Sequence, residues 1–355
     1  METRKLKERK KFLEELVSIP SPSGLEQKCT EIFKSYCSKF AKEYYSDKIG
    51  NTVYSIGTGP KKILLSGHID ELGMQVIKID SSGSLIVYPL SIDKKVLPGS
   101  KVLVETDKGN WIPGIIGKKP VHAEDVDDRS SAIKISEMTI DLGFTKPEEV
   151  KEAGIGIGSF VVYDRNYDGI DFGKDRILAP GLDDKLGLYI ATMIGEELSN
   201  FDDVLEKYQI LIASTTQEEV GLRGATVLAQ NIKPDISIDF DVTPSSDFGV
   251  ETKEWGDVEV GKGPVIEYGP DKSIRLCKKL KSIAETNKID IQPTVTGRPG
   301  GTNTDVLQLF GGDCETVHIA LPIKNLHTPV EICSWSDTEK AIDLVVKLIC
   351  DSIDL

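Results

Sequence analysis

One stretch limits the possible folds of this chain more than any other: the apolar run Tyr208–Ser214 and the acidic turn Thr215–Gly221 that follows it. A short apolar run of this kind is typical of a strand buried in a parallel sheet. The adjacent acids Glu218 and Glu219 then lie where the strand ends. In open α/β sheets, ligands bind at that carboxyl edge. Neighbouring carboxylates repel, so these two either point apart into solvent or face a cation or a shared proton.

A second predicted strand also ends in residues that bind metals. The run Lys61–Gly67 leads directly into His68 and Asp70. These two side chains share a side of the strand, because residues two apart point the same way. Asp70 is therefore placed to orient a metal-bound histidine or to bind the metal itself. A structural His–Asp hydrogen bond explains the same pair equally well.

Two later strands bring further candidates to the same edge. The strand Asp235–Thr243 carries Asp239 and Asp241 near its end, and strand alternation places both on one face. Alternation alone therefore does not choose between them. The strand Ile319–Ile323 is followed by a loop that contains His327.

A pair of acids opens a predicted helix. Asp183 and Asp184 come immediately before the apolar periodic stretch Leu186–Leu198. Acidic residues are favoured at a helix N-terminus, because they cap backbone N–H groups and interact with the helix dipole. Capping accounts for one of the two acids, and the second exceeds what a cap needs.

The pattern of strands and helices predicts an α/β fold with a mixed, mostly parallel sheet and helices on both faces. Apolar residues at helical spacing between Leu6 and Val17 predict an amphipathic first helix. Pro20 ends it. Ser23 and Glu26 have the spacing of a capping box, which predicts the start of a second helix.

The pattern of the sequence changes between about residue 73 and about residue 173, where short β-like pieces alternate with turn residues. This pattern is typical of a small all-β barrel or sandwich. We therefore expect an α/β catalytic domain in two parts, 1–72 and 174–355, around an inserted β-rich domain at 73–173. The β-like pieces are Met74–Ile79, Ser84–Tyr88, Lys101–Glu105, Gly114–Ile116 and Phe160–Tyr163.

Composition excludes several classes of protein. The formal charge of -14 over 355 residues argues against a nucleic-acid or anionic-membrane partner. The six cysteines are scattered without Cys-x-x-Cys spacing, so neither a zinc ribbon nor a disulfide framework is indicated. The N-terminus lacks the apolar core of a signal peptide, and no run reaches membrane-spanning length. We therefore expect a cytoplasmic protein.

Taken together, the predicted strand ends and helix start carry two histidines and several carboxylates. This donor set suits zinc, cobalt or manganese. More carboxylates converge than one ion needs, and two cations would relieve their mutual repulsion. The candidates are His68, Asp70, Asp183, Glu218, Glu219, Asp241 and His327.

The order of these motifs resembles that of a known family, the M42 metallo-aminopeptidases. These are TET-type, glutamyl-aminopeptidase-like enzymes, some of which were formerly labelled endoglucanases. The resemblance covers almost the whole chain, and it is the series of motifs that is specific. The matching segments are Gly67–Gly73, Gly181–Lys185, Gln217–Gly224, Asp241–Thr243 and His327–Glu331.

The resemblance implies a role for each candidate residue. His68 and Asp241 would bind one metal, Glu219 and His327 the other, and Asp183 would bridge both. The resemblance thus favours Asp183 over its neighbour and Asp241 over Asp239. It also implies a di-metal exopeptidase fold, a β-barrel-like insert used in oligomerisation, and a hollow tetrahedral dodecamer.

The resemblance further implies a catalytic mechanism. Glu218 would be the general base, and Asp70 would orient His68. A hydroxide that bridges the two metals would attack the scissile carbonyl of a peptide with a free N-terminus. The sequence departs from the family at Lys185, where many members carry Arg, and at Asn303, where many carry Asp. Both departures concern contacts on the substrate side rather than the metals.

Two other functions fit the same residues. A deacylase or carboxypeptidase could use the same dinuclear site, and a preference for N-blocked substrates would identify a deacylase. A non-catalytic scaffold that binds metal for assembly would not need Glu218, which is not a ligand in this scheme.

Overall fold

The computed structural model describes residues 2–90, 92–118, 120, 122, 138–165, 169–248, 256–297 and 300–351. These residues form two compact units. The larger unit comprises Met1–Glu71, Tyr167–Leu326 and Val330–Leu355, and the smaller comprises Leu72–Asn166 and His327–Pro329. The division at residues 72 and 173 that the sequence suggests stays a prediction.

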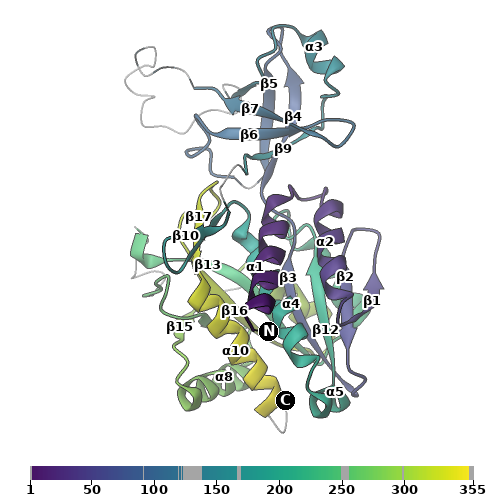
Figure 1. Ribbon diagram of the computed structural model, residues 1–355, viewed down its shortest axis with the longest axis vertical. Coiled ribbons are helices and arrows are strands. Elements are labelled where there is room, and N and C mark those ends of the chain that lie inside the picture. Colours follow the sequence, from purple (N-terminus) through teal and green to yellow (C-terminus); the bar gives the residue numbers. More distant parts are fainter. Residues whose placement is uncertain are drawn as a thin grey trace. The chain divides into compact units, whose positions relative to one another are not determined.

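An eight-stranded sheet forms the centre of the larger unit (Figure 1). Its four middle strands, β12, β3, β13 and β16, run parallel to one another, so their carboxyl ends meet at one edge. β2 and β14 run antiparallel to their inner neighbours, which makes the sheet mixed. In spatial order the strands are β1 (Lys42–Ser46), β2 (Thr52–Ile56), β12 (Tyr208–Thr215), β3 (Lys61–His68), β13 (Ile236–Pro244), β16 (Glu315–Ile323), β14 (Val265–Tyr268) and β15 (Gln292–Val295).

Both faces of this sheet are covered, because the apolar side chains of its strands point alternately to either side. In β3, Ile63 and Leu65 join one core cluster, whereas Leu64 joins another. The first cluster receives side chains from α1 (Glu2–Ser18), α2 (Gln27–Cys37), α4 (Leu182–Leu198), α8 (Ile274–Asn287) and α10 (Trp335–Asp351). The second receives them from α6 (Arg223–Ile232) and α9 (Asn303–Phe310). The predicted α/β fold with a mostly parallel sheet and helices on both faces is therefore confirmed.

Helix α4 is the central helix of this unit. It contacts strands β3, β12 and β13, and it also contacts α1 and α10 (Figure 1). Smaller elements complete the unit. They are the helix α5 (Asp202–Lys207), the 3-10 turn η4 (Ser246–Phe248), and a three-stranded sheet of β10 (Asp171–Phe172), β11 (Arg176–Ala179) and β17 (Glu331–Ser334).

The predicted first helix is confirmed, but the predicted capping box before the second is wrong. Helix α1 ends at Ser18, two residues before Pro20. The N-cap of α2 is Glu26 rather than Ser23. The Ser23 hydroxyl instead donates a hydrogen bond to Asp70 Oδ2 at 2.7 Å. The Ser23 hydroxyl thus makes a tertiary contact and does not cap the helix.

The smaller unit is a closed β-barrel, as the run of short β-like pieces predicts. Its strands follow the order β4-β5-β8-β7-β6-β9, and the ring closes where β4 pairs with β9. Inward-facing apolar side chains fill it as a separate core cluster. The strands are β4 (Gly73–Ile79), β5 (Leu85–Leu90), β6 (Lys101–Glu105), β7 (Trp111–Ile116), β8 (Thr139–Asp141) and β9 (Phe160–Tyr163), and helix α3 (Pro147–Glu152) lies between β8 and β9.

None of the helices in the described ranges combines the length and the apolar character that a membrane crossing requires.

Candidate metal centre

The register of the central strands brings the predicted site residues to one edge of the sheet. Thr215, the last residue of β12, lies beside His68, the last residue of β3. On the other side of β3, Ser66 pairs with Asp239 of β13. Residues 216–219 and the end of β13 therefore flank His68, as expected from the parallel order.

His68 lies at the centre of this group. Its side chain is almost fully buried, and its Nδ1 lies 2.9 Å from the carbonyl oxygen of Asp70. Its other ring nitrogen, Nε2, lies 3.2 Å from Asp183 Oδ1 and 3.8 Å from Glu218 Oε2. Nδ1 is thus held by backbone while Nε2 faces carboxylates, which is the arrangement of a metal-binding histidine.

The two acids at the start of α4 differ in their contacts. Asp184 accepts hydrogen bonds from the backbone N–H of His68 at 3.1 Å and of Gly187 at 3.0 Å. Its carboxylate therefore caps the helix and joins it to β3. Asp183 instead approaches the His68 ring, and its own backbone N–H donates to Glu331 Oε2 at 3.3 Å. The capping role that the sequence assigns to one of the pair belongs to Asp184.

Asp70 holds the turn that carries the two glutamates. Its Oδ1 accepts the backbone N–H of Glu218 at 3.0 Å, and its Oδ2 accepts that of Glu219 at 3.2 Å. Its Oδ1 also lies 3.5 Å from His68 Nδ1. Asp70 thus contacts both the histidine and the turn, and the contact with the turn was not anticipated from the sequence.

Position along β13 separates the two acids that strand alternation left equivalent. Asp239 accepts a hydrogen bond from Ser66 Oγ at 2.6 Å, and its other oxygen lies 3.6 Å from His318 Nδ1. His318 is therefore a packed, paired histidine. Asp241, two residues nearer the edge, groups with His68 and Asp184.

Potential ligand atoms converge in two overlapping groups. The first contains His68, Asp183 and Glu219, and the second contains His68, Asp184 and Asp241. Within each group, one ligand atom per residue lies within 4.8 Å of the others. One nitrogen and several carboxylate oxygens match the donors preferred by zinc and similar divalent ions. The residues present therefore fit a metal centre.

The electrostatics of the group also fit a cation. Burial raises the pKa of the Glu218 carboxyl to about 9, with a further contribution from Asp241. Burial and the charge of Asp183 raise the pKa of Asp241 to about 7. Burial alone would lower the pKa of His68, but hydrogen bonds with Asp183 and Asp70 raise it well above its ordinary value. So many buried carboxylates require either protons or cations among them.

The fifth predicted ligand, His327, lies between β16 and β17 with a left-handed φ of 64°. It groups with the smaller unit. Its contact with the residues described above stays a prediction.

The two departures from the family pattern lie in the interior. Lys185 is fully buried, with its Nζ 3.3 Å from Glu71 Oε2 and donating to the carbonyl of Ile19 at 3.0 Å. Asn303 is also buried, and its Nδ2 donates to Thr215 Oγ1 at 3.1 Å. Lys185, at the start of α4, and Asn303, beside the end of β12, therefore make their described contacts with other groups of the protein.

Sequence reasoning missed two residues that support the group: Ser23 and Glu331. Each makes a hydrogen bond with a predicted site residue. Glu331 was within a quoted motif but was given no task. Ser23 was read as a helix-capping residue, and the partner that corrects this assignment, Asp70, is 47 residues away in sequence.

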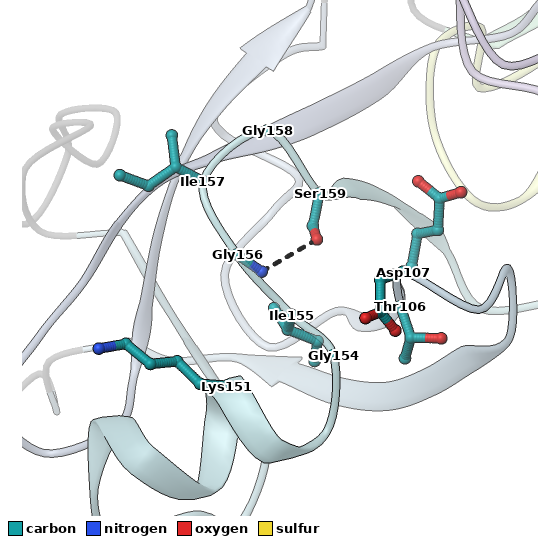
Figure 2. Close-up of a pocket in the computed structure, with 10 residues that line it drawn as sticks. Thr106, Asp107, Lys151, Gly154, Ile155, Gly156, Ile157, Gly158 and Ser159 are labelled. Atoms are coloured by element: carbon teal, nitrogen blue, oxygen red, sulfur yellow. Dashed lines mark hydrogen bonds between the residues drawn. The ribbon is translucent and has the colours of Figure 1, made fainter.

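A hollow in the smaller unit offers no comparable chemistry. It has a volume of about 500 Å³, and the turn Gly154–Ser159 forms one wall (Figure 2). Within that turn the Gly156 N–H donates to Ser159 Oγ at 3.2 Å. None of the lining residues is a histidine or a cysteine, so a zinc-type donor set is missing there. The lining comprises Glu105, Thr106, Asp107, Lys151 and residues 154–159.

Comparisons with known proteins agree with the motif series. The M42 glutamyl aminopeptidase family model matches residues 50–344. A lysyl aminopeptidase from Pyrococcus furiosus is 28% identical over 343 residues, which cover 95% of this chain and 96% of that protein.

Solved structures extend the likeness to the fold. A TET aminopeptidase from a marine sediment archaeon of the Thaumarchaeota is 29% identical, with a TM-score of 0.91 covering 99% of this chain and 98% of that one. The TET1 peptidase of Pyrococcus horikoshii, which can assemble into a tetrahedron or a large octahedral shell, is 31% identical. Its TM-score is 0.82, over 96% of this chain and 99% of that one. The resemblance is confirmed, and this chain belongs to the M42 family of peptide-hydrolysing aminopeptidases.

Proposed function

We propose that this chain is a di-metal aminopeptidase that removes single residues from the free N-terminus of peptides. The observation that carries the proposal is the pair of ligand groups that share His68. His68 and Asp241 would hold one divalent ion, Glu219 and His327 the other, and Asp183 would bridge them. Zinc and cobalt fit this donor set best, and manganese is a further candidate.

In sites of this kind, bound divalent ions supply a nucleophile near neutral pH and polarise the scissile carbonyl. Glu218 supplies the proton transfer. Its carboxylate lies 3.8 Å from His68 Nε2, so it faces the same space as the ligands. It would take a proton as the carbonyl is attacked and then give it to the leaving amine. Asp70 would keep Glu218 in place through the backbone hydrogen bond at 3.0 Å.

The test is a panel of chromogenic aminoacyl substrates, assayed after chelation and again with added zinc, cobalt or manganese. We expect hydrolysis only where the α-amine is free, loss of activity with the chelator, and recovery with one of the metals. Matched N-acetylated substrates are the control. Activity confined to the blocked substrates would replace this proposal with the deacylase. A protein that holds both metals yet cleaves nothing would favour the scaffold.

We further infer that the chain forms a homo-oligomer, for which the tetrahedral dodecamer is the candidate form. Support comes from its likeness to the Pyrococcus horikoshii TET1 peptidase over almost the full length of both chains. Light scattering on the purified protein measures the mass directly. A monomer at working concentrations would contradict the inference.

A further inference from the structure

The first residues of helix α4 do not have regular helical geometry. Asp183 and Asp184 have ψ angles of 106° and 37°, outside the helical range. The N–H groups at the start of any helix also have no acceptor within the helix itself. Contacts with other parts of the chain therefore fix the position of Asp183.

Lys185, the next residue of α4, makes such a contact. Its side chain is fully buried, and its Nζ lies 3.3 Å from Glu71 Oε2 and donates to the carbonyl oxygen of Ile19 at 3.0 Å. A Cβ built on Gly181, the N-cap of the helix, would lie 2.4 Å from Glu71 Oε2 and 3.5 Å from Lys185 Nζ. The ion pair thus lies directly against the N-terminal end of α4, beside the segment that carries Asp183.

Glu71 is itself held firmly by the segment between α1 and α2. Its Oε1 accepts the backbone N–H of Ser21 at 2.7 Å, and its own N–H donates to the Ser21 carbonyl at 3.0 Å. Its carbonyl accepts the N–H of Ser23 at 3.3 Å. Glu71 also directly follows Asp70 in the segment that begins with His68. The Lys185–Glu71 pair therefore joins the start of α4 to the residues that follow β3.

We propose that Lys185 is a positioning residue for Asp183, acting through its buried ion pair with Glu71. This inference rests on the proposed function, in which Asp183 bridges two metals. The pair joins the two segments whose spacing determines the distance between His68 Nε2 and Asp183 Oδ1, which is 3.2 Å. Without the Lys185 cation, the start of α4 loses this anchor and Asp183 moves relative to His68. Both metals should then bind more weakly, because Asp183 is a proposed ligand of each.

The first measurement is a calorimetric titration of the metal-free protein with zinc or cobalt, comparing Lys185→Met with Arg9→Met. Arg9 is the matched control, because its buried guanidinium pairs with Glu196 and Glu197 at the other end of the same helix. Removing a group that orients a metal ligand typically lowers metal affinity by about 10- to 100-fold, so we expect that loss for Lys185→Met. Arg9→Met should bind metal like the unmodified chain, although it also loses an ion pair. The absorption spectrum of the cobalt form, which reports ligand geometry, should change in Lys185→Met alone.

A second variant separates anchoring from the cost of an unpaired buried charge. Removing one partner of a buried ion pair is destabilising, whereas replacing both partners is often neutral. The double variant Lys185→Met/Glu71→Gln has no charge left at the pair, so its melting temperature without metal should exceed that of Lys185→Met. Its metal affinity should stay low, because the anchor is still missing.

Unchanged metal affinity in Lys185→Met or in the double variant overturns the inference, and so does an equal loss of affinity in Arg9→Met. If Lys185→Met does not fold, the double variant takes its place in the same comparison with Arg9→Met. An unmodified chain that binds no divalent metal would instead refute the proposed metal centre, which is a distinct result.

Discussion

At the scale of single residues, Glu218 and Glu219 are neighbours with the same chemistry and different predicted tasks. Glu218 faces His68 Nε2, whereas Glu219 belongs to a ligand group with His68 and Asp183. Glu218→Gln keeps the shape of the side chain but cannot accept a proton. We expect kcat to fall by about two to four orders of magnitude, the range of general acid–base assistance, while metal content is unchanged.

Glu219→Gln is the control for this prediction, because it makes the same chemical change one residue later. It removes the charge of a predicted ligand, so metal affinity should fall first and excess metal should restore part of the activity. Steady-state kinetics with metal analysis on both variants distinguishes the two roles. A fully active Glu218→Gln, or a Glu219→Gln that binds metal like the unmodified enzyme, would contradict the assignment.

The sequence predicted residue types at this site better than it predicted their partners. Strand alternation put Asp239 and Asp241 on one face, and only their different distances along β13 separate them. Likewise, Asp183 and Asp184 were equivalent until the backbone hydrogen bonds of Asp184 identified it as the cap. Such choices depend on contacts between segments more than 100 residues apart in the chain, for example 116 between His68 and Asp184. A local pattern does not contain that information.

At the scale of elements, the close packing of α4 against β3 places the site. A Cβ at Gly67 would lie 2.6 Å from the carbonyl carbon of Gly187, closer than any side chain tolerates. Gly67→Ala should therefore push the start of α4, with Asp183, away from the end of β3. We expect a loss of about 1–3 kcal/mol in the free energy of unfolding, the usual cost of overpacking, together with weaker metal binding.

Gly156→Ala is the matched control, because a Cβ there would have open space around it. Urea unfolding and calorimetric metal titration measure both effects. If the two alanine variants are equally stable and bind metal equally well, close packing at Gly67 does not position the site.

The same scale shows why some elements were predictable and others were not. Long apolar runs with polar ends, such as those of β3 and β12, identified the buried central strands directly. The three-residue strand β8 and the four-residue strands β14 and β15 are too short to give a periodic signal. Their pairing partners determine that they are strands, and pairing is a tertiary property.

At the scale of the whole molecule, metal binding should be linked to stability. Ions that bind only the folded state stabilise it by about 2.7 kcal/mol at 100 times the dissociation constant. We therefore expect the melting temperature to fall on chelation and to recover with added metal. His68→Ala, which removes the residue common to both ligand groups, should reduce this metal-dependent difference. Equal melting temperatures with and without metal in the unmodified chain would argue against the centre.

The smaller unit has its own prediction, which concerns assembly. Its described residues include four large apolar side chains with substantial exposure: Ile77 (45%), Tyr88 (52%), Ile115 (46%) and Ile157 (79%). Exposed apolar groups of this kind often mark protein–protein contacts. Ile77 and Tyr88 lie on the paired strands β4 and β5, and the Gly158 N–H donates to the Val76 carbonyl at 2.8 Å, which brings Ile157 beside β4. We predict that this side of the barrel forms part of a subunit interface.

Tyr88→Asp and Ile157→Asp test this interface, because an unpaired charge is costly to bury between subunits. We expect either variant to lower the mass measured by light scattering, while circular dichroism and metal content stay unchanged. Phe201→Asp is the control, since Phe201 is similarly exposed, at 44%, but belongs to the larger unit. If both barrel variants assemble like the unmodified chain, or if the Phe201 variant alone dissociates, the interface is elsewhere and the barrel has another role.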